Sequence, residues 1–455
     1  MTNSNVSLDD KYSIESGRIF VTGVQALARI PMVQRQRDVL EGLNTAGFIS
    51  GYRGSPVGGF DQQLWRAKKF LEQNHIRFQP GLNEDLAASA IWGSQQTNLH
   101  EGGKYDGVFA IWYGKGPGVD RCGDVFKHGN MSGPAKHGGV LLIAGDDHAA
   151  KSSTVPHQSE YAFMDASIPV LNPAGLQDIV DYGILGFAMS RFSGCWVAFK
   201  TTAENMDSSA SIDVSPDRVK ISLPKFDMPE GGLSIRWPDD WIEQEHRLHQ
   251  YKLNAVRAFA RQNKIDKTII NSQNPKLGVV TTGKSYLDVR QALEDLGINE
   301  AKADKIGLRL YKVGMPWPLE PQGIDEFSQG LKEILVIEEK RPIIESQLKE
   351  HLYNHAPKNR PNVVGKYDDK GQFLQPAAGE LSPSLIAEVI ASRILQFSDD
   401  TAIREKLKFM QDKENGLIKP ETDFARTPFF CSGCPHNTST KVPDGSRATA
   451  GIGCH

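Results

Sequence analysis

Short apolar runs alternate with longer helical stretches along the first half of the chain. Five runs of four to six residues have the length and the aromatic and β-branched content of buried strands. Strands and helices that alternate at this spacing predict an α/β fold with a doubly wound, mostly parallel sheet. The expected strands are Phe48–Tyr52, Val108–Tyr113, Gly139–Ala144, Ile168–Leu171 and Cys195–Phe199. The expected helices are Val24–Asn44, Gly59–Asn74, Glu84–His100, Val119–Met131 and Gly175–Arg191.

The second half of the chain repeats this alternation on a smaller scale. Residues 214–240 are rich in proline and glycine and predict a linker, which a charged helix over Trp241–Gln262 follows. Three further apolar runs predict a small three-stranded α/β module, and residues 354–380 predict another loop. The expected strands are Leu277–Thr281, Leu308–Val313 and Ile334–Glu338, and the expected helices are Tyr286–Leu296, Pro383–Gln396 and Thr401–Lys413.

Composition and charge narrow the function classes. The chain has 455 residues, with 52 Lys plus Arg and 55 Asp plus Glu, so its formal net charge is −3, which argues against a nucleic-acid binder. No uncharged apolar run reaches the ~18 residues of a membrane span, and Met1–Glu15 lacks the apolar core of a secretory signal. Five cysteines, an odd number, are typical of a reducing compartment. We therefore expect a cytoplasmic protein with no membrane or nucleic-acid partner.

The segment Gly51–Pro56 (GYRGSP) directly follows an expected strand. Ligands of open parallel sheets bind beyond the carboxyl ends of the strands, so Ser55 and the neighbouring backbone N–H groups are candidates for holding a ligand. Arg53 is a candidate for pairing with a carboxylate or a phosphate. The competing interpretation is a strand-to-helix turn in which Ser55 lies near a helix start.

The segment Gly81–Asp85 (GLNED) opens an expected helix that is rich in small residues. Asn83 is a plausible N-cap, and acids in the first helical turn suit the positive end of the helix dipole without any further role. A helix face of alanine, serine and glycine also lets another segment pack closely, which would bury Glu84. A buried carboxylate needs a partner, so this position stays a candidate for function.

Two other motifs carry metal-ligand residue types. Asp146-Asp147-His148 follows the expected strand Gly139–Ala144, where a loop cap is favoured over a metal site. Cys431 and Cys434 form a C-x-x-C pair with His436 beside it. Nineteen residues separate Cys434 from Cys454, which His455 follows. Such spacing suits zinc, an iron–sulfur ligand set or a redox pair, but the pair alone does not make a site, and we predict no metal ligands in this chain.

Five motifs taken in order resemble the indolepyruvate ferredoxin oxidoreductases. They are Gly47–Phe60 (GFISGYRGSPVGGF), Gly81–Glu84 (GLNE), Trp112–Gly118 (WYGKGPG), Gly145–His148 (GDDH) and Cys431–His436 (CSGCPH). The resemblance runs from about residue 19 to 455 and is closest to the long, fused members of the family. It is specific because all five motifs fall in the family's order.

This resemblance implies thiamine-diphosphate chemistry on 2-oxo acids. Members of the family oxidatively decarboxylate an aryl pyruvate such as indolepyruvate, form an acyl-CoA and pass electrons through iron–sulfur clusters to ferredoxin. Coenzyme A and ferredoxin are then the expected partners, in a homo-oligomer, usually a dimer. The Gly-Asp-Gly type Mg²⁺ motif and the cluster motifs are absent from these residues, so the resemblance implies that the chain is the N-terminal portion of a larger enzyme.

The resemblance also assigns roles to single residues. Glu84 matches the acid that lies against the pyrimidine ring nitrogen of the cofactor, where a buried carboxyl group gives and takes a proton. Ser55 and Pro56 match the loop beside the thiazolium ring and the substrate, and Arg53 is a weaker candidate for the substrate carboxylate. The remaining matches line the cofactor site, and they are Cys431, Cys434, His436 and Cys454.

The family architecture implies a division of the chain. It predicts a disordered lead-in over 1–18, a pyrimidine-binding domain over 19–213, a linker over 214–275 and a transketolase C-terminal-like domain over 276–352. Connector helices over 353–426 and the first part of a diphosphate-binding domain over 427–455 complete it. Two alternatives remain: a non-oxidative thiamine-dependent decarboxylase or transketolase-like enzyme, and a zinc-binding interaction module built on the cysteines.

Overall fold

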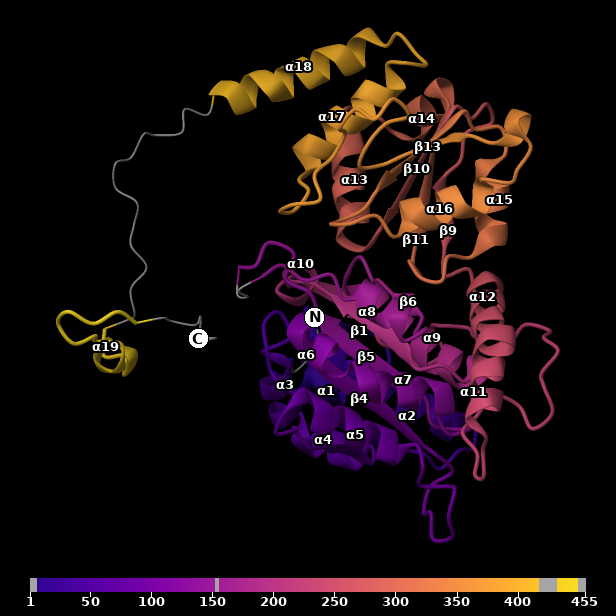
Figure 1. Ribbon diagram of the computed structural model, residues 1–455. Helices are drawn as coiled ribbons and strands as arrows, with labels where there is room; N and C mark the ends of the chain where they lie inside the picture. The colour runs from indigo at the N-terminus through magenta and orange to yellow at the C-terminus, as the bar shows by residue number, and fades with distance from the viewer. Residues whose placement is uncertain (1–5, 152–154, 417–431, 449–455) are drawn as a thin grey trace, which may run out of the picture.

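Two α/β modules make up most of the protein. The computed structural model describes residues 6–151, 155–416 and 432–448. The first module contains a six-stranded sheet and the second a five-stranded sheet. Beside the first module lie α11 (Trp241–Arg247), a π-helical turn (Leu248–Lys252) and α12 (Leu253–Gln262), and α12 also contacts the second module (Figure 1). No helix in the described part of the chain is long and apolar enough to cross a membrane.

The sheet of the first module is parallel throughout, in the order β3-β2-β4-β5-β7-β6. Every residue of its central strands β5 and β7 is buried, which explains why these strands read as continuous apolar runs. The strands are β2 (Ala46–Gly51), β3 (Ile76–Phe78), β4 (Val108–Lys115), β5 (Val140–Gly145), β6 (Val170–Leu171) and β7 (Val197–Thr201). The expected doubly wound parallel sheet is confirmed.

Helices cover both faces of this sheet. Alternate residues of β4 belong to two cores, with Phe109 and Ile111 facing α2 (Gly23–Leu40) and α9 (Leu176–Ser193). Ala110 and Trp112 face the opposite core. That core is built by α5 (Glu84–Ser94), α6 (Gly116–Arg121) and α7 (Gly123–Ser132). The shorter helices of the module are α3 (Phe60–Arg66), α4 (Lys68–Gln73), α8 (Glu160–Asp165) and α10 (Ala203–Met206).

The start of the chain differs from the expected disordered lead-in over 1–18. Residues 10–13 form α1 (Asp10–Ser13), and Tyr12 is buried with its hydroxyl donating to Gln63 Oε1 at 2.7 Å. The buried guanidinium of Arg29 donates to the carbonyls of Tyr12 and Ile14. Next, β1 (Arg18–Thr22) pairs antiparallel with β8 (Ser209–Asp213). The polar composition of this segment gave no sign of these elements. A few buried side chains are nevertheless enough to order a short segment.

The second module has five strands, where the sequence predicts three. Its sheet order is β13-β12-β10-β11-β9, with β9 antiparallel and the other strands parallel. Both unexpected strands lie at the edges and are short, and β9 begins with exposed Lys267 and Thr268. The sheet therefore extends beyond residues 276–352 at both ends. Its strands are β9 (Lys267–Ile270), β10 (Leu277–Thr282), β11 (Leu308–Val313), β12 (Glu333–Ile337) and β13 (Asn362–Val364).

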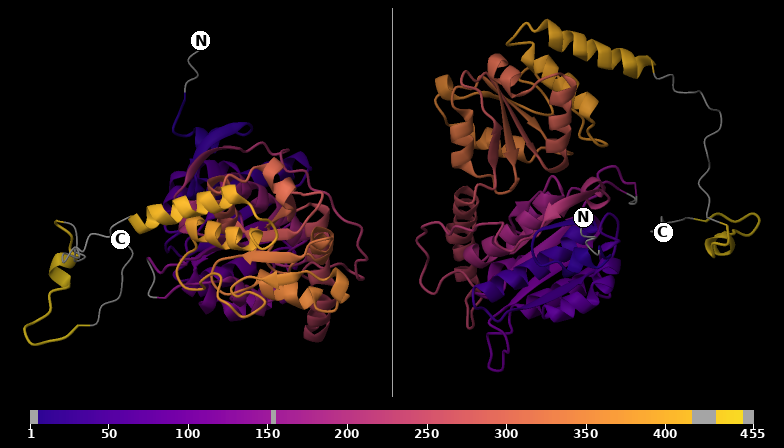
Figure 2. Two further views of the ribbon diagram at one scale, coloured as in Figure 1. Left: turned by 90° about the horizontal axis from the view of Figure 1, so that it is seen from above. Right: turned by 180° about the vertical axis from the view of Figure 1, so that it is seen from behind.

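The helices of the second module also pack on both faces of its sheet. One core includes α13 (Gly283–Asp295), α14 (Glu300–Ile306) and α17 (Pro383–Ile394), and α18 (Thr401–Gly416) packs on α17. The opposite core includes α15 (Pro321–Ser328) and α16 (Ile344–Leu352). Beyond the modules, α19 (His436–Ser439) lies apart from both sheets in every view (Figures 1 and 2).

The two modules meet at the carboxyl edges of their sheets. Val170 N–H donates to the carbonyl of Trp317 at 2.7 Å, and Asn172 N–H donates to the carbonyl of Gly314 at 2.9 Å. A buried polar cavity at the join is lined from one side by residues after β5 and β7 and from the other side by residues after β10 and β12. The second module thus covers part of the edge at which parallel sheets bind ligands.

Candidate functional site

The loop after β2 folds across the ends of β4 and β5. A Cβ atom at Gly54 would lie 3.0 Å from Lys115 Cβ, and one at Gly145 would lie 2.9 Å from Pro56 Cδ, so neither glycine leaves space for a side chain. Pro56 is buried after a cis peptide bond, Ser55 is half-buried and Arg53 is exposed. The loop therefore presents Ser55 at the carboxyl edge of the sheet, where the motif predicts a ligand.

Glu84 is the first residue of α5 and lies beside α6. Asn83 caps the helix as expected, since its Oδ1 accepts the N–H of Leu86 at 2.8 Å. The indole N–H of Trp112 in β4 donates to the carbonyl of Glu84 at 3.1 Å, which ties the helix start to the sheet. A Cβ atom at Gly118 would lie 2.5 Å from Glu84 Cγ. The close approach that the small residues predict is therefore present.

The Glu84 side chain is mostly covered and still reachable. Its exposed fraction is 13%, and Arg121 Nη1 lies 3.9 Å from Oε2 as its ion-pair partner among the described residues. The Arg121 side chain is itself more than half exposed, so solvent weakens that attraction. Leu82 and Leu86 flank the site with large exposed apolar side chains. The carboxylate thus lies at the border of an uncovered apolar surface.

Glu84 and Ser55 approach the same short segment of chain. Gly54, next to Ser55, packs against Lys115, and Glu84 packs against Gly118, so the two candidate residues lie near opposite ends of residues 115–118. Asp61 is a further buried acid that none of the sequence motifs indicated, and its carboxylate accepts the hydroxyl of Tyr113 in β4. Burial raises the pKa of Asp61, and this hydrogen bond acts in the opposite direction. A carboxylate within the helix after the GYRGSP loop is the signal that would have identified it.

The carboxyl ends of β5 and β7 form the other half of the same sheet edge, and this half is sealed from solvent. Asp146 Oδ2 accepts the N–H of Ser159 at 2.9 Å, and Asp147 Oδ1 accepts the N–H of Lys151 at 2.9 Å, which is the loop-capping arrangement. Lys200 Nζ lies 2.5 Å from Glu160 Oε1 and 3.4 Å from Asp146 Oδ2, all buried. Burial opposes the charge on Lys200, but these acids outweigh it and raise its pKa.

His148 belongs to this sealed half. It is buried, and neither ring nitrogen has a hydrogen-bond partner. Burial, together with the charges of Lys200, Lys340 and Lys284, holds the pKa of His148 well below its usual value, so the ring is neutral. The sequence shows each of these residues, but their partners come from segments far apart in the chain, and no local pattern reveals the network.

The cysteine motif lies mostly outside the described residues. Cys431 and Cys454 are not described, whereas Cys434 Sγ lies 3.3 Å from His436 Nδ1 at the start of α19. His436 is exposed, and Figures 1 and 2 show this segment away from the first module. The structure therefore does not bring Cys434 and His436 to Glu84. Two further described cysteines, Cys122 and Cys195, are buried in the first module.

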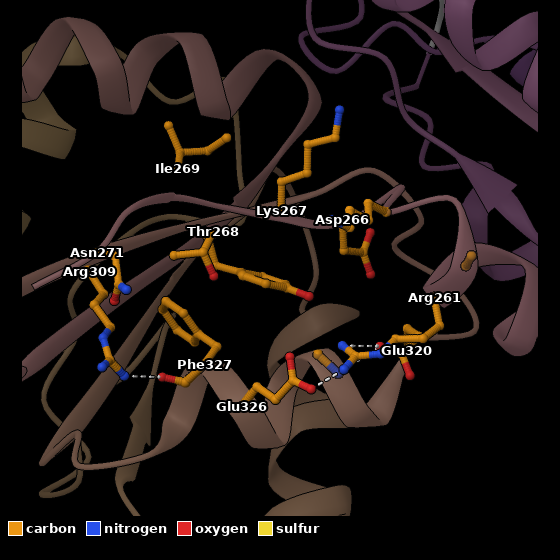
Figure 3. A pocket seen from close by; sticks show the side chains of 14 residues that line it. Arg261, Asp266, Lys267, Thr268, Ile269, Asn271, Arg309, Glu320, Glu326 and Phe327 are labelled. Carbon is orange, nitrogen blue, oxygen red and sulfur yellow. Dashed lines mark hydrogen bonds and ion pairs between the residues drawn. The ribbon is translucent and has the colours of Figure 1, made fainter. Parts of the chain in front are cut away.

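A separate pocket of about 720 Å³ lies beside the edge strand β9 of the second module (Figure 3). Asp266 Oδ1 accepts the N–H groups of Gly314 at 2.7 Å and Met315 at 3.0 Å, while its Oδ2 is buried without a partner. Burial raises the pKa of Asp266 to about 7. The lining comes from α12, β9, β11 and α15, so the pocket is distinct from the edge that carries Glu84 and Ser55.

Comparison with known proteins places the chain among related sequences. Residues 267–416 match the model of the indolepyruvate oxidoreductase domain family. The chain is 25% identical over 435 residues to the indolepyruvate oxidoreductase subunit IorA of Pyrococcus horikoshii, with 93% of this chain and 58% of that protein covered. It is 25% identical over 428 residues to the IorA of Methanothermobacter thermautotrophicus, with 93% and 59% covered. The chain thus spans less than three fifths of the length of these relatives.

A solved structure shares the fold. The 2-oxoglutarate:ferredoxin oxidoreductase from Magnetococcus marinus, determined with 2-oxoglutarate, coenzyme A and succinyl-CoA bound, matches with a TM-score of 0.57 at 15% identity. The match covers 83% of this chain and 65% of that one. This likeness shows a shared fold. The domain match and the relatives aligned over most of the chain show that the chain is similar to indolepyruvate oxidoreductases, which are the family that the five ordered motifs resemble.

Proposed function

We propose that this chain is the pyrimidine-binding part of a thiamine-diphosphate-dependent oxidoreductase. The whole enzyme would oxidatively decarboxylate an aryl 2-oxo acid of the indolepyruvate kind, form an acyl-CoA and pass the electrons to ferredoxin. The observation that carries this proposal is the placement of Glu84 at the first turn of α5, tight against Gly118 and beside an open apolar surface. The matches to indolepyruvate oxidoreductases support it.

The residues present fit the pyrimidine ring of such a cofactor. Glu84 offers a carboxyl group that is mostly covered and whose ion pair with Arg121 is long at 3.9 Å, so its oxygens remain available to a ring nitrogen. The exposed side chains of Leu82 and Leu86 offer apolar surface of the kind that an aromatic ring covers. When bound, the cofactor supplies a carbon nucleophile for the keto group and an electron sink after CO₂ leaves.

The chain's own residues would position the reactants and move one proton. Glu84 would hold a proton on a carboxyl oxygen facing the pyrimidine ring, in a site where partial exclusion of water strengthens that hydrogen bond. The Ser55 hydroxyl would donate to the substrate carboxylate. The exposed guanidinium of Arg53 would attract the same carboxylate, and buried Pro56 would fix the loop against β5.

The remaining assignments extend the proposal to the whole chain. We assign residues 19–213 to pyrimidine binding and the second module to the transketolase C-terminal-like domain. For Cys431, Cys434, His436 and Cys454 to line the cofactor, the segment around α19 must approach the first module. The ligands of Mg²⁺ and the iron–sulfur clusters would come from other parts of the complete enzyme, which we expect to be a dimer.

The test is a Glu84→Gln variant of the complete enzyme. We expect it to bind cofactor but to exchange the cofactor's acidic ring proton about 10²–10⁴ times more slowly, because the amide cannot give and take the proton. The exchange is followed by NMR, and turnover by reduction of a viologen dye with aryl pyruvates. The matched control is Asp85→Asn, one residue along the same helical turn. Equal exchange in Glu84→Gln and wild type would remove Glu84 from this role.

A second readout tests the reaction class. The proposal requires dye reduction that depends on the 2-oxo acid. Release of an aldehyde from the 2-oxo acid without dye reduction would instead identify a non-oxidative thiamine enzyme. Aryl and alkyl 2-oxo acids compared at equal concentration would then show whether the aryl group is preferred.

A further inference from the structure

Two histidines and an aspartate meet on the outer face of the second module. Asp325 lies in α15, His351 lies near the end of α16, and His355 lies in the turn that follows α16. His351 Nε2 is 2.7 Å and His355 Nε2 is 3.7 Å from Asp325 Oδ1. Taken as three ligand atoms, one from each residue, they lie within 4.8 Å of one another.

Packing of α15 and α16 in one core positions these three residues. Ile324 of α15 and Leu348 and Leu352 of α16 are buried in one core, which fixes the two helices side by side. The rings of His351 and His355 lie close together, with their centroids 5.3 Å apart. The N–H of His355 donates to the carbonyl of Leu352 at 3.0 Å, which closes the turn that follows α16. Asp325, next to Ile324, faces both rings.

We propose that Asp325, His351 and His355 bind a divalent transition-metal ion, with Zn²⁺ as the reference ion. Zinc binds imidazole nitrogen and carboxylate oxygen at roughly 2.0–2.2 Å, which puts neighbouring ligand atoms of a tetrahedron roughly 3.3–3.6 Å apart. The observed 2.7 and 3.7 Å distances lie on either side of that spacing, so small rotations of the side chains suffice. Water would complete the coordination.

The chemistry of the three groups selects the class of ion. Two imidazoles and one carboxylate favour zinc, nickel, cobalt or copper over magnesium and calcium, which prefer oxygen ligands. The side chains of Asp325, His351 and His355 are 42%, 29% and 34% exposed, so an ion can enter and keep a water ligand. No lysine or arginine forms an ion pair with Asp325 among the described residues.

The proposed ion would tie α15 to the end of α16. Both helices pack on the same face of the five-stranded sheet, so the bound ion would stabilise the folded module. Protons compete with the metal for imidazole nitrogen, so binding weakens as the solution becomes acidic. This site shares no residue with the cysteine motif or with the edge that carries Glu84, and it does not depend on the proposed function.

The experiment uses the full chain with Cys431, Cys434 and Cys454 replaced by serine, because those thiols also attract zinc. The protein is freed of metal with EDTA, titrated with Zn²⁺ or Co²⁺ and analysed by equilibrium dialysis. We expect one ion per chain, a cobalt spectrum without a thiolate charge-transfer band, and a rise in melting temperature with Zn²⁺. Absence of ion binding in this triple variant would overturn the proposal.

Single variants then locate the ion. His351→Asn and His355→Gln should each weaken Zn²⁺ binding at least about tenfold and abolish the Zn²⁺-dependent rise in melting temperature. Their melting temperatures without metal show whether they still fold. The matched control is His249→Gln, which removes an exposed histidine elsewhere and should leave binding unchanged. Equal affinity in all three variants would place the ion elsewhere and overturn the proposal.

Discussion

The carboxyl edge of the first sheet has an open half and a sealed half. At the ends of β2 and β4, Ser55 and Glu84 border exposed surface. At the ends of β5 and β7, Asp146, Glu160 and Lys200 are buried, and the second module covers Glu160 and Lys200. In both halves, acidic residues lie just after a strand or in the first turn of a helix. This difference indicates that the role of an acid at a strand end depends on what packs over it. A covered acid is structural, whereas an acid that solvent can reach is available for chemistry.

The largest expected effect is on stability and lies in the sealed half. Lys200→Met leaves Glu160 and Asp146 buried without their cation, so the free energy of unfolding should fall by about 3–5 kcal/mol. Urea unfolding followed by circular dichroism measures it. Lys68→Met, which removes an exposed pair with Glu72, is the control and should change the value by less than about 0.5 kcal/mol.

A double variant sharpens the same point. Lys200→Met combined with Glu160→Leu replaces the ion pair with apolar side chains and should recover more than half of the lost stability. A loss for Lys200→Met no greater than that for Lys68→Met would show that the second module does not seal this half of the edge.

The next effect is on activity and lies in the open half. A methyl group at Gly118 would lie 2.5 Å from Glu84 Cγ, so Gly118→Ala must displace the carboxylate. Turnover of the complete enzyme should fall about 10- to 100-fold with little change in stability, because the displaced side chain is reachable from solvent and misplacement of a reacting group is costly. Gly123→Ala, where a methyl group meets no atom within 4 Å, is the control. Equal turnover of the two variants would separate Glu84 from catalysis.

The third effect is on the pH dependence of stability. The pKa of His148 is held well below its usual value in the fold, so below about pH 6.5 the unfolded chain takes up a proton that the folded chain does not. This histidine therefore lowers stability as the pH falls. His148→Leu should remove up to about 1.4 kcal/mol of that loss per pH unit between about pH 6 and 5.

Comparison with wild type isolates this effect. Asp266 and Glu338, whose pKa values burial raises to about 7, change stability in the opposite direction over the same range in both proteins. Urea unfolding at several pH values gives the slopes, and exposed His249→Leu is the control. An unchanged slope in His148→Leu would mean that water reaches the ring and that this half is less sealed than its contacts indicate.

The smallest expected effect concerns Ser55. Removing a single hydroxyl that donates to the substrate carboxylate costs about 1 kcal/mol, so Ser55→Ala should raise KM about fivefold and leave the unfolding free energy within about 0.5 kcal/mol of wild type. Steady-state kinetics of the complete enzyme measures the first quantity and urea unfolding the second. A large loss of stability would instead mean that the loop serves the fold, as in the sealed half.

The sequence predicted the strands that are buried on both faces, because such strands are continuous apolar runs. The expected β4, β5 and β7 all appear within two residues of their predicted bounds at each end. It missed β3, β9 and β13, which have three or four residues each and lie at sheet edges. These three strands are too short for a run of apolar residues to mark them, whereas the edge strand β6 falls within the expected strand Ile168–Leu171.

By itself the sequence determined the alternation of strands and helices, the Asn83 cap of α5 and the close approach of chain segments near Glu84. These follow from short-range patterns such as apolar runs, capping residues and glycines. Only the tertiary structure decided that Glu84 borders solvent while Lys200 and His148 are sealed. That outcome depends on where the second module packs. The residues on the two sides of the join are at least 80 positions apart in the chain, as Lys200 and Lys284 are.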